Sequence, residues 1–401
     1  MEAKARTGPA GAPPAAPGEI LSRARELAAD LVDRADEHDR EGTFASENVA
    51  AVWAAGLGLL TVPRELGGAG ADLATTLRTI EILGAADAST ALVMCMHWNH
   101  LSQIIAPATP WPEPLRELVL ERCQAGPALI NSAVVEPDLG SPSRGGVPAT
   151  RARRVGLQDA QEWVLDGRKT FVTGSVGLAF IVVRAATVAD TPEPVEVGSF
   201  LVPAPRPGLS VVPTWDHLGL RASASHDVVL DEVRVPLTHA FALQPASSPP
   251  EPIGRARSIL MQTSVYTGVA RAARDWLAKY LNQRVPSNLG APLASLPRFR
   301  AAMGEIEALI YASERLLHGL APEVQAGTAD GLEAATVKRL VTANVMRCTE
   351  QAVALVGNPG LSYHHPLQRH LRDSLCSRIH APQDDVTASE LGGRALDRAS
   401  S

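Results

Sequence analysis

Apolar residues recur at intervals of three and four positions near the start of the chain. From Glu19 onward they fall at Ile20, Leu21, Ala24, Leu27, Leu31 and Val32. The same spacing returns through residues 49–53 and 75–83. Because an α-helix has about 3.6 residues per turn, this spacing gathers the apolar side chains on one helical face. It predicts an N-terminal helical domain over residues 19–126.

The pattern changes after residue 126. Short runs rich in β-branched residues are separated by Gly, Pro and Asp, and these runs lie at 163–165, 181–183, 200–202, 228–230 and 233–235. Runs of this length with such separators are typical of strands joined by turns. They predict a central antiparallel β-domain over residues 127–242.

Long helical patterns return after the proline-rich segment 247–252. They span residues 259–281, 299–320, 335–356 and 367–379. These patterns predict a C-terminal helical domain over residues 253–398. Residues 1–18 are dominated by Ala, Pro and Gly, so we expect a disordered leader there. The predicted fold class is α+β with three domains.

Composition narrows the classes of function. The chain has 401 residues, of which 45% are hydrophobic, and this is enough for a large buried core. Its 37 basic and 43 acidic residues are mixed along the sequence and leave a net charge of -6, so neither nucleic acid nor an anionic membrane is an expected partner. The four cysteines show no disulfide or metal spacing, and no apolar run is long enough for a membrane span. We therefore expect a cytoplasmic protein without a metal site.

Several strings follow one another in a recognisable order. They are Asp166-Gly167-Arg168-Lys169-Thr170-Phe171-Val172-Thr173-Gly174-Ser175, Leu218-Gly219-Leu220-Arg221-Ala222-Ser223, Asp231-Glu232-Val233-Arg234-Val235-Pro236, and Gly357-Asn358-Pro359-Gly360 followed by Arg372-Asp373. In order and spacing the chain resembles the acyl-CoA dehydrogenase superfamily. The resemblance implies an N-terminal helical domain, a central antiparallel β-domain and a C-terminal four-helix bundle. It also implies a bound flavin and assembly into a homotetramer or homodimer.

The same resemblance implies which residues contact the flavin. Phe171, Thr173 and Ser175 match the flavin-lining strand, and Gly357 and Gly360 match a glycine turn of the last domain. Arg284 is similar in position to an arginine that reaches the cofactor of a neighbouring subunit, although the residues after it depart from the family pattern. Both FAD and FMN remain open as the cofactor.

The residue that departs most from the family pattern is Ala381. Counting on from Arg372-Asp373, the catalytic glutamate of the family falls on Ala381, and its alternative position in the first long helix after the β-domain falls near Ser258. Neither position offers a carboxylate to remove the proton from carbon, whereas the flavin's redox chemistry does not depend on that base. A flavin protein without the base is suited to a reaction with dioxygen.

His380 stands beside the substituted position. The string Ile379-His380-Ala381-Pro382 is similar to that of dibenzothiophene-type flavin monooxygenases and related proteins of sulfone metabolism. This resemblance implies that His380 assists oxygen transfer to a small organic substrate, together with His97 and Asn131. The alternatives are that His380 caps the closing helix and that His97 is structural, since dehydrogenases of the family also carry a histidine there.

Two other functions remain open at this point. The chain could be a dehydrogenase of acyl-CoA or acyl-carrier-protein thioesters that uses Asp384 or Asp385 as a displaced base, or a non-catalytic scaffold that binds a flavin or an acyl ligand. No GxGxxG follows a predicted strand, so a monooxygenase on this chain would need a separate flavin reductase as partner.

Overall fold

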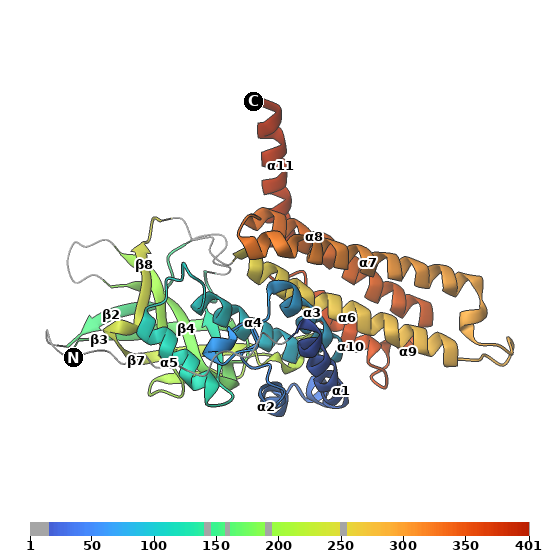
Figure 1. Cartoon of the computed structure of the whole chain (residues 1–401), viewed down its shortest axis with the longest axis horizontal. Helices are drawn as coiled ribbons and strands as arrows, with labels where there is room; N and C mark the ends of the chain where they lie inside the picture. The colour runs from blue at the N-terminus through green and yellow to red at the C-terminus, as the bar shows by residue number, and fades with distance from the viewer. Residues whose placement is uncertain (1–15, 140–145, 157–160, 189–194, 249–254, 401) are drawn as a thin grey trace.

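Helices make up the N-terminal part of the molecule. This computed structural model describes residues 16–139, 146–156, 161–188, 195–248 and 255–400. The first helices are α1 (Pro17–Glu41), α2 (Ser46–Ala54), α3 (Leu73–Ala86), α4 (Ala88–Ile104) and α5 (Glu113–Gln124) (Figure 1). The Asp72 carboxylate accepts a hydrogen bond from the Thr75 N–H at 2.8 Å, which explains why α3 begins where it does. Because α1 begins at Pro17, the expected leader extends too far, and its residues 1–15 lie outside the described part of the chain.

The described residues form one eight-stranded sheet, whose order is β6-β7-β3-β2-β4-β5-β8, with β1 paired to β4. The strands are β1 (Leu129–Ala133), β2 (Arg151–Val155), β3 (Glu162–Val172), β4 (Leu178–Thr187), β5 (Glu196–Pro203), β6 (Leu209–Val212), β7 (His226–Pro236) and β8 (Ala240–Pro245). Strand β4 runs parallel to both β1 and β2, so the expectation of a wholly antiparallel domain is wrong there. Strand β3 runs antiparallel to β2, and the next reversal brings β4 back into the direction of β2. Strand β8 also continues past the expected boundary at 242.

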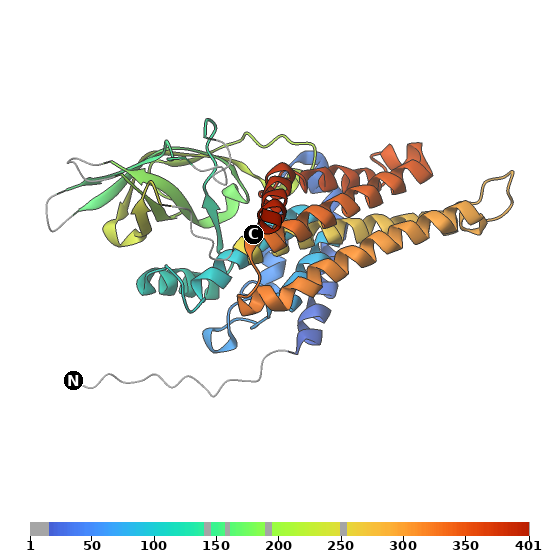
Figure 2. The same ribbon diagram turned by 90° about the horizontal axis from the view of Figure 1, so that it is seen from above.

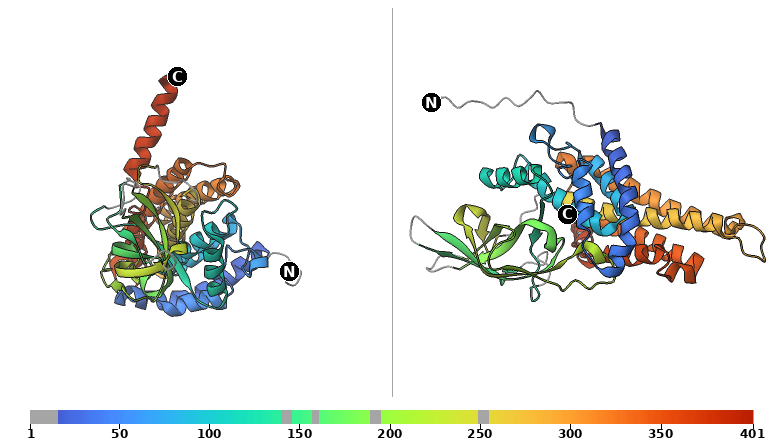
Figure 3. Two further views of the ribbon diagram at one scale, coloured as in Figure 1. Left: turned by 90° about the vertical axis from the view of Figure 1, so that its left-hand side faces the viewer. Right: turned by 90° about the horizontal axis from the view of Figure 1, so that it is seen from below.

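Three long helices and one shorter helix pack together in the C-terminal part. They are α6 (Arg255–Gln283), α7 (Pro297–Ala326), α8 (Gly331–Val356) and α10 (Leu367–Cys376), with the short α9 (Asn358–Leu361) between the last two. Figure 2 shows α6 and α7 extending together beyond the rest of the molecule, and Figure 3 shows the sheet at the other end. The expected order of helices, sheet and helices is thereby confirmed. Helix α10 ends at Cys376, earlier than the predicted 379, and residues 377–379 form a turn.

Helices α3 and α6 approach each other unusually closely. A Cβ added at Gly84 would lie 2.5 Å from the Val265 carbonyl oxygen, and one added at Gly268 would lie 2.3 Å from the Glu81 carbonyl oxygen. Neither backbone oxygen can move aside easily, so both helices need glycine at the crossing. This contact joins the N-terminal helices to the C-terminal bundle.

Ion pairs and hydrogen bonds join all three parts at one junction. The Arg372 guanidinium on α10 pairs with the Asp39 carboxylate on α1 and donates to the Leu218 carbonyl oxygen at 2.7 Å. The Leu220 N–H donates to Oδ1 of the buried Asp373 at 2.7 Å. The loop from β6 to β7 is therefore fixed between α1 and α10, and this loop forms part of the cavity described below.

The last helix, α11 (Asp384–Ser400), projects away from the body of the molecule (Figure 1). An ion pair between Arg394 and the Asp330 carboxylate, at 2.5 Å, connects it to the start of α8. None of the helices in the described ranges combines the length and the apolar character that a bilayer crossing requires.

Candidate functional site

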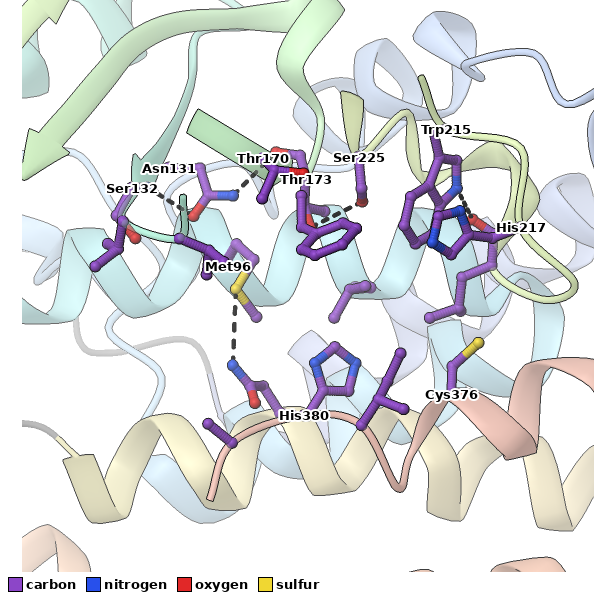
Figure 4. A pocket seen from close by; sticks show the side chains of 18 of the residues that line it. Met96, Asn131, Ser132, Thr170, Thr173, Trp215, His217, Ser225, Cys376 and His380 are labelled. Carbon is purple, nitrogen blue, oxygen red and sulfur yellow. Dashed lines mark hydrogen bonds between the residues drawn. The ribbon is translucent and has the colours of Figure 1, made fainter. Parts of the chain in front are cut away.

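A cavity of about 560 Å³ lies where the sheet meets α4, α6 and the turn after α10. Figure 4 shows Asn131, Thr170, Thr173 and Ser225 on one side of it and His380 on the other. The residues that line it are Leu92, Met96, Asn131, Ser132, Val134, Val135, Thr170, Phe171, Thr173, Trp215, His217, Leu220, Ser225, Gln262, Cys376, Ile379, His380, Ala381 and Gln383. No aspartate, glutamate, lysine or arginine is among these lining residues. The cavity therefore offers neutral hydrogen-bonding groups on a largely apolar surface.

His380 reaches the cavity from the turn between α10 and α11. Its Nε2 lies 2.5 Å from the hydroxyl oxygen of Tyr266, which is buried in α6. Burial, and then the nearby charge of Lys338, lower the pKa of His380 to about 4. Burial also raises the pKa of Tyr266 well above its ordinary value. At neutral pH the pair is a neutral imidazole beside a neutral phenol, so His380 exchanges hydrogen bonds without carrying charge.

A buried lysine holds the turn that carries His380. Lys338 on α8 is 3% exposed, and its ammonium group donates to the Pro382 carbonyl oxygen at 3.0 Å. Burial lowers the pKa of Lys338, whereas the Asp384 carboxylate opposes that shift. A lysine in this environment fixes the backbone two residues after His380.

The two aspartates considered as displaced bases lie at the start of α11. Neither Asp384 nor Asp385 lines the cavity. Asp384 lies close enough to Lys338 to favour its charged form, and Asp385 is exposed. The position expected for the glutamate, Ala381, does line the cavity and presents only a methyl group there.

Hydroxyl and amide groups line the wall formed by the sheet. The Asn131 amide nitrogen donates to the Thr173 carbonyl oxygen at 2.9 Å, and its Oδ1 accepts from the Ser132 N–H at 2.7 Å. Asn131 therefore holds β1 to the end of β3, and both ends of its amide are occupied. The Ser225 hydroxyl donates to the Thr173 hydroxyl oxygen at 3.0 Å, which leaves the Thr173 proton for a ligand.

An aromatic surface adjoins these hydroxyl groups. The Trp215 and His217 rings stack with centroids 3.6 Å apart, and the Phe171 ring meets both edge to face. Phe171 is 54% exposed, although it is a large apolar side chain. The buried Nδ1 of His217 has no hydrogen-bond partner among the described residues.

These features fit a flavin. A flat ring system would cover the exposed Phe171 ring, and its carbonyl and nitrogen atoms would meet the Thr173 hydroxyl and His217 Nδ1. Within the described ranges no group of three or more His, Cys, Asp or Glu side chains is placed to hold a metal ion.

The structure does not bring His97 to this cavity. His97 is fully buried, its Nε2 donates to the Gly58 carbonyl oxygen at 3.1 Å, and its Nδ1 accepts from the Ile130 N–H at 3.3 Å. Burial lowers its pKa to about 3. Ser175 does not line the cavity either, and its hydroxyl donates to the Ala224 carbonyl oxygen at 2.7 Å. Both residues hold neighbouring segments together.

The remaining predicted cofactor residues lie elsewhere on this chain. Arg284 follows the end of α6, Gly357 follows α8, and Gly360 is in α9. None of the three lines the cavity. A role for Arg284 at a neighbouring subunit's cofactor stays a prediction.

Sequence reasoning missed several residues of this site. They are Tyr266, Gln262, Lys338, Trp215, His217 and Cys376. Tyr266 is 114 positions from His380, so no local pattern connects the two. Lys338 is the one charged residue among the buried residues of α8, and its place on that helical face was a usable signal, since a buried lysine needs a partner.

Three family models match consecutive parts of the chain. They describe the N-terminal, middle and C-terminal domains of acyl-CoA dehydrogenase and match residues 18–110, 132–233 and 257–396. The putative acyl-CoA dehydrogenase YdbM of Bacillus subtilis (strain 168) is 31% identical over 382 residues, which cover 94% of this chain and 96% of that relative.

Solved structures are similar over almost the whole chain. KijD3 in complex with FMN and dTDP-3-amino-2,3,6-trideoxy-4-keto-3-methyl-D-glucose is 28% identical with a TM-score of 0.83, covering 96% of this chain and 95% of that one. The dibenzothiophene monooxygenase TdsC from Paenibacillus sp. A11-2 is 22% identical with a TM-score of 0.81, covering 94% of this chain and 97% of that one. At that identity the second likeness shows the shared fold.

Proposed function

The chain belongs to the acyl-CoA dehydrogenase family, whose members are flavin-dependent oxidoreductases. Within that family we propose that it is a flavin-dependent monooxygenase acting on a small organic substrate. The observation that carries the proposal is the set of groups around the cavity. Ala381 stands where the family's base is expected, no lining residue is acidic, and the neutral His380–Tyr266 pair stands beside the alanine. Such a site can direct hydrogen bonds but has no carboxylate to remove a proton from carbon.

The reaction balances with dioxygen and reduced flavin. One oxygen atom joins the substrate, and the other leaves as water with the two electrons and two protons that the reduced flavin supplies. Bound flavin would supply the redox chemistry. The chain's own residues would bind the substrate against apolar side chains and keep bulk water away from the reacting atoms.

His380 is the residue we assign to the oxygen-transfer step. We assign the Tyr266 hydroxyl as the donor to Nε2, which places the ring proton on Nδ1, an atom for which the structure gives no partner among the described residues. That N–H would donate to the transferred oxygen or to the substrate. Thr173 and the Phe171–Trp215–His217 surface would position the ring system, and Asn131 would hold the wall on which they stand.

FMN is the cofactor we favour. KijD3, at 28% identity, was solved with FMN, and the departures after Arg284 weaken the case for a site that holds the larger FAD. We further propose that a separate reductase delivers the reduced flavin and that the chain assembles as a homodimer or homotetramer.

The competing function is dehydrogenation of an acyl thioester, the activity in the name of the relative YdbM. It requires a base in the cavity, and Asp384 and Asp385 lie outside the lining. One experiment separates the two functions: reduced FMN or FAD is supplied under air with a panel of thioesters, amines and sulfur compounds. A mass gain of one oxygen supports the proposal, and a loss of two hydrogens from a thioester contradicts it.

The first prediction concerns His380→Ala. This variant should bind flavin with unchanged affinity and lose product formation by about 10²- to 10⁴-fold, since it removes the proposed hydrogen-bond donor. Flavin fluorescence titration measures the binding, and mass spectrometry measures the product. His364→Ala, an exposed histidine away from the cavity, is the matched control and should keep both. Unchanged turnover of His380→Ala would remove His380 from the mechanism.

A further inference from the structure

A second cavity, of about 410 Å³, opens where α1, α3, α6 and α7 meet. It shares no lining residue with the cavity that holds His380. Its lining residues are Leu21, Arg25, Arg78, Ile82, Arg271, Glu314, Arg315 and His318. Four arginines thus face one carboxylate, on a chain whose net charge is -6.

The arginines fall into two groups. Arg271 is already neutralised, because its guanidinium pairs with Glu314 at 2.5 Å and with Glu81 at 3.4 Å. The structure gives the other three, Arg25, Arg78 and Arg315, neither a hydrogen bond nor an ion pair within the described ranges. All three are exposed at the rim of the cavity. Like charges on α1, α3 and α7 therefore surround one opening with no counter-charge of their own.

An unpartnered nitrogen lies among the same lining residues. His318 Nε2 donates to Oε1 of Glu81 at 3.0 Å, and Glu81 is fully buried. This bond fixes the imidazole in place. The other nitrogen, Nδ1, is buried and has no hydrogen-bond partner among the described residues. Nδ1 is therefore available to a ligand in the cavity.

We propose that this cavity binds the phosphoryl group of a small phosphorylated molecule. Guanidinium groups present paired N–H donors that match phosphate oxygens, and arginine is the residue most often used for this purpose. The volume of about 410 Å³ exceeds that of a single phosphate ion and leaves room for a second phosphate or an organic group. Leu21 and Ile82 give that remainder an apolar surface.

Pyrophosphate is the probe for a test that requires no turnover. Isothermal titration calorimetry of the full chain should show one site per chain, with affinity that falls as salt rises. The double variant R78Q/R315Q should weaken binding at least about tenfold, since each removes a charge-assisted contact. The control R339Q/R347Q removes two exposed arginines of α8, which changes net charge equally, and should bind as the native chain does.

Two results would overturn the proposal. The first is absence of pyrophosphate binding by the native chain, or equal binding by R78Q/R315Q and R339Q/R347Q. The second is a change in the oligomeric state of R78Q/R315Q, by light scattering, because the arginines would then contact acidic residues of a second copy. Circular dichroism melting of both double variants establishes that each is folded. Product formation does not enter the test, so its outcome is independent of the proposed monooxygenase activity.

Discussion

At the scale of single residues, the proposed oxygen transfer depends on His380, a histidine kept neutral by its surroundings. Burial is the first cause of the lowered pKa of His380, and the ammonium of Lys338 is the second. The same ammonium group holds the Pro382 carbonyl oxygen. Lys338 therefore acts on His380 in two ways, through charge and through the position of the backbone.

Lys338→Met tests both effects. Removal of the positive charge should raise the pKa of His380, while burial keeps it below the ordinary histidine value. NMR titration of the His380 ring measures this shift independently of turnover. Product formation should fall by roughly 10- to 100-fold as the turn loses its anchor. Arg339→Met, at the exposed neighbouring position, should change neither quantity; if Lys338→Met also leaves both unchanged, Lys338 has no positioning role.

At the scale of helices, the contact between α3 and α6 depends on two glycines. Gly268→Ala would place a Cβ 2.3 Å from a backbone oxygen, so it should lower the free energy of unfolding by about 1–3 kcal/mol despite the better helix propensity of alanine. Gly304→Ala on α7 is the control, because no atom lies within 4 Å of its added Cβ. It should be neutral or stabilising by up to about 1 kcal/mol. Urea unfolding of both variants measures the difference. Equal unfolding midpoints for Gly268→Ala and Gly304→Ala would mean that α3 and α6 can move apart enough to accept the added methyl group without cost.

Local sequence patterns predicted the helices and strands well, because apolar spacing reports directly on which face is buried. The parallel pairing of β4 with β1 and β2 was not predictable in this way. A local apolar pattern does not tell which distant strand will become the neighbour. In the site, His380 and Ala381 were found because they are adjacent to a recognisable string. Tyr266 was missed because its partner, His380, is distant along the chain. His97 was expected at the cavity because the local sequence around a histidine does not show whether it faces a cavity or the core.

At the scale of the whole molecule, the junction around Asp373 makes stability depend on pH. Burial raises the pKa of Asp373 to about 7 from 3.8, although the hydrogen bond from the Leu220 N–H opposes the shift. Between these values the native state holds a proton that the unfolded state has released. The stabilisation that this proton gives to the native state is therefore fully present below pH 3.8 and is lost as the pH rises to about 7. The free energy of unfolding falls by at most about 1.4 kcal/mol per pH unit in this range.

Asp373→Asn should flatten this dependence, because asparagine keeps the acceptor for the Leu220 N–H and does not ionise. Urea unfolding at pH 5 to 8 should show a smaller loss of stability with rising pH in the variant than in the native chain. Asp33→Asn, an exposed residue of α1, should retain the native dependence. Parallel curves for Asp373→Asn and the native chain would exclude Asp373 as the source.

The position of Trp215, stacked on His217 in the cavity wall, allows flavin binding to be followed by tryptophan fluorescence. The chain has six tryptophans, and Trp215 is the one among the residues that line the His380 cavity. Energy transfer from its excited indole to a bound isoalloxazine would quench its emission, and a Trp215→Phe variant would lose that part of the quenching. The protein thus contains its own optical reporter of occupancy, which separates a chain that binds flavin without reacting from one that never binds it.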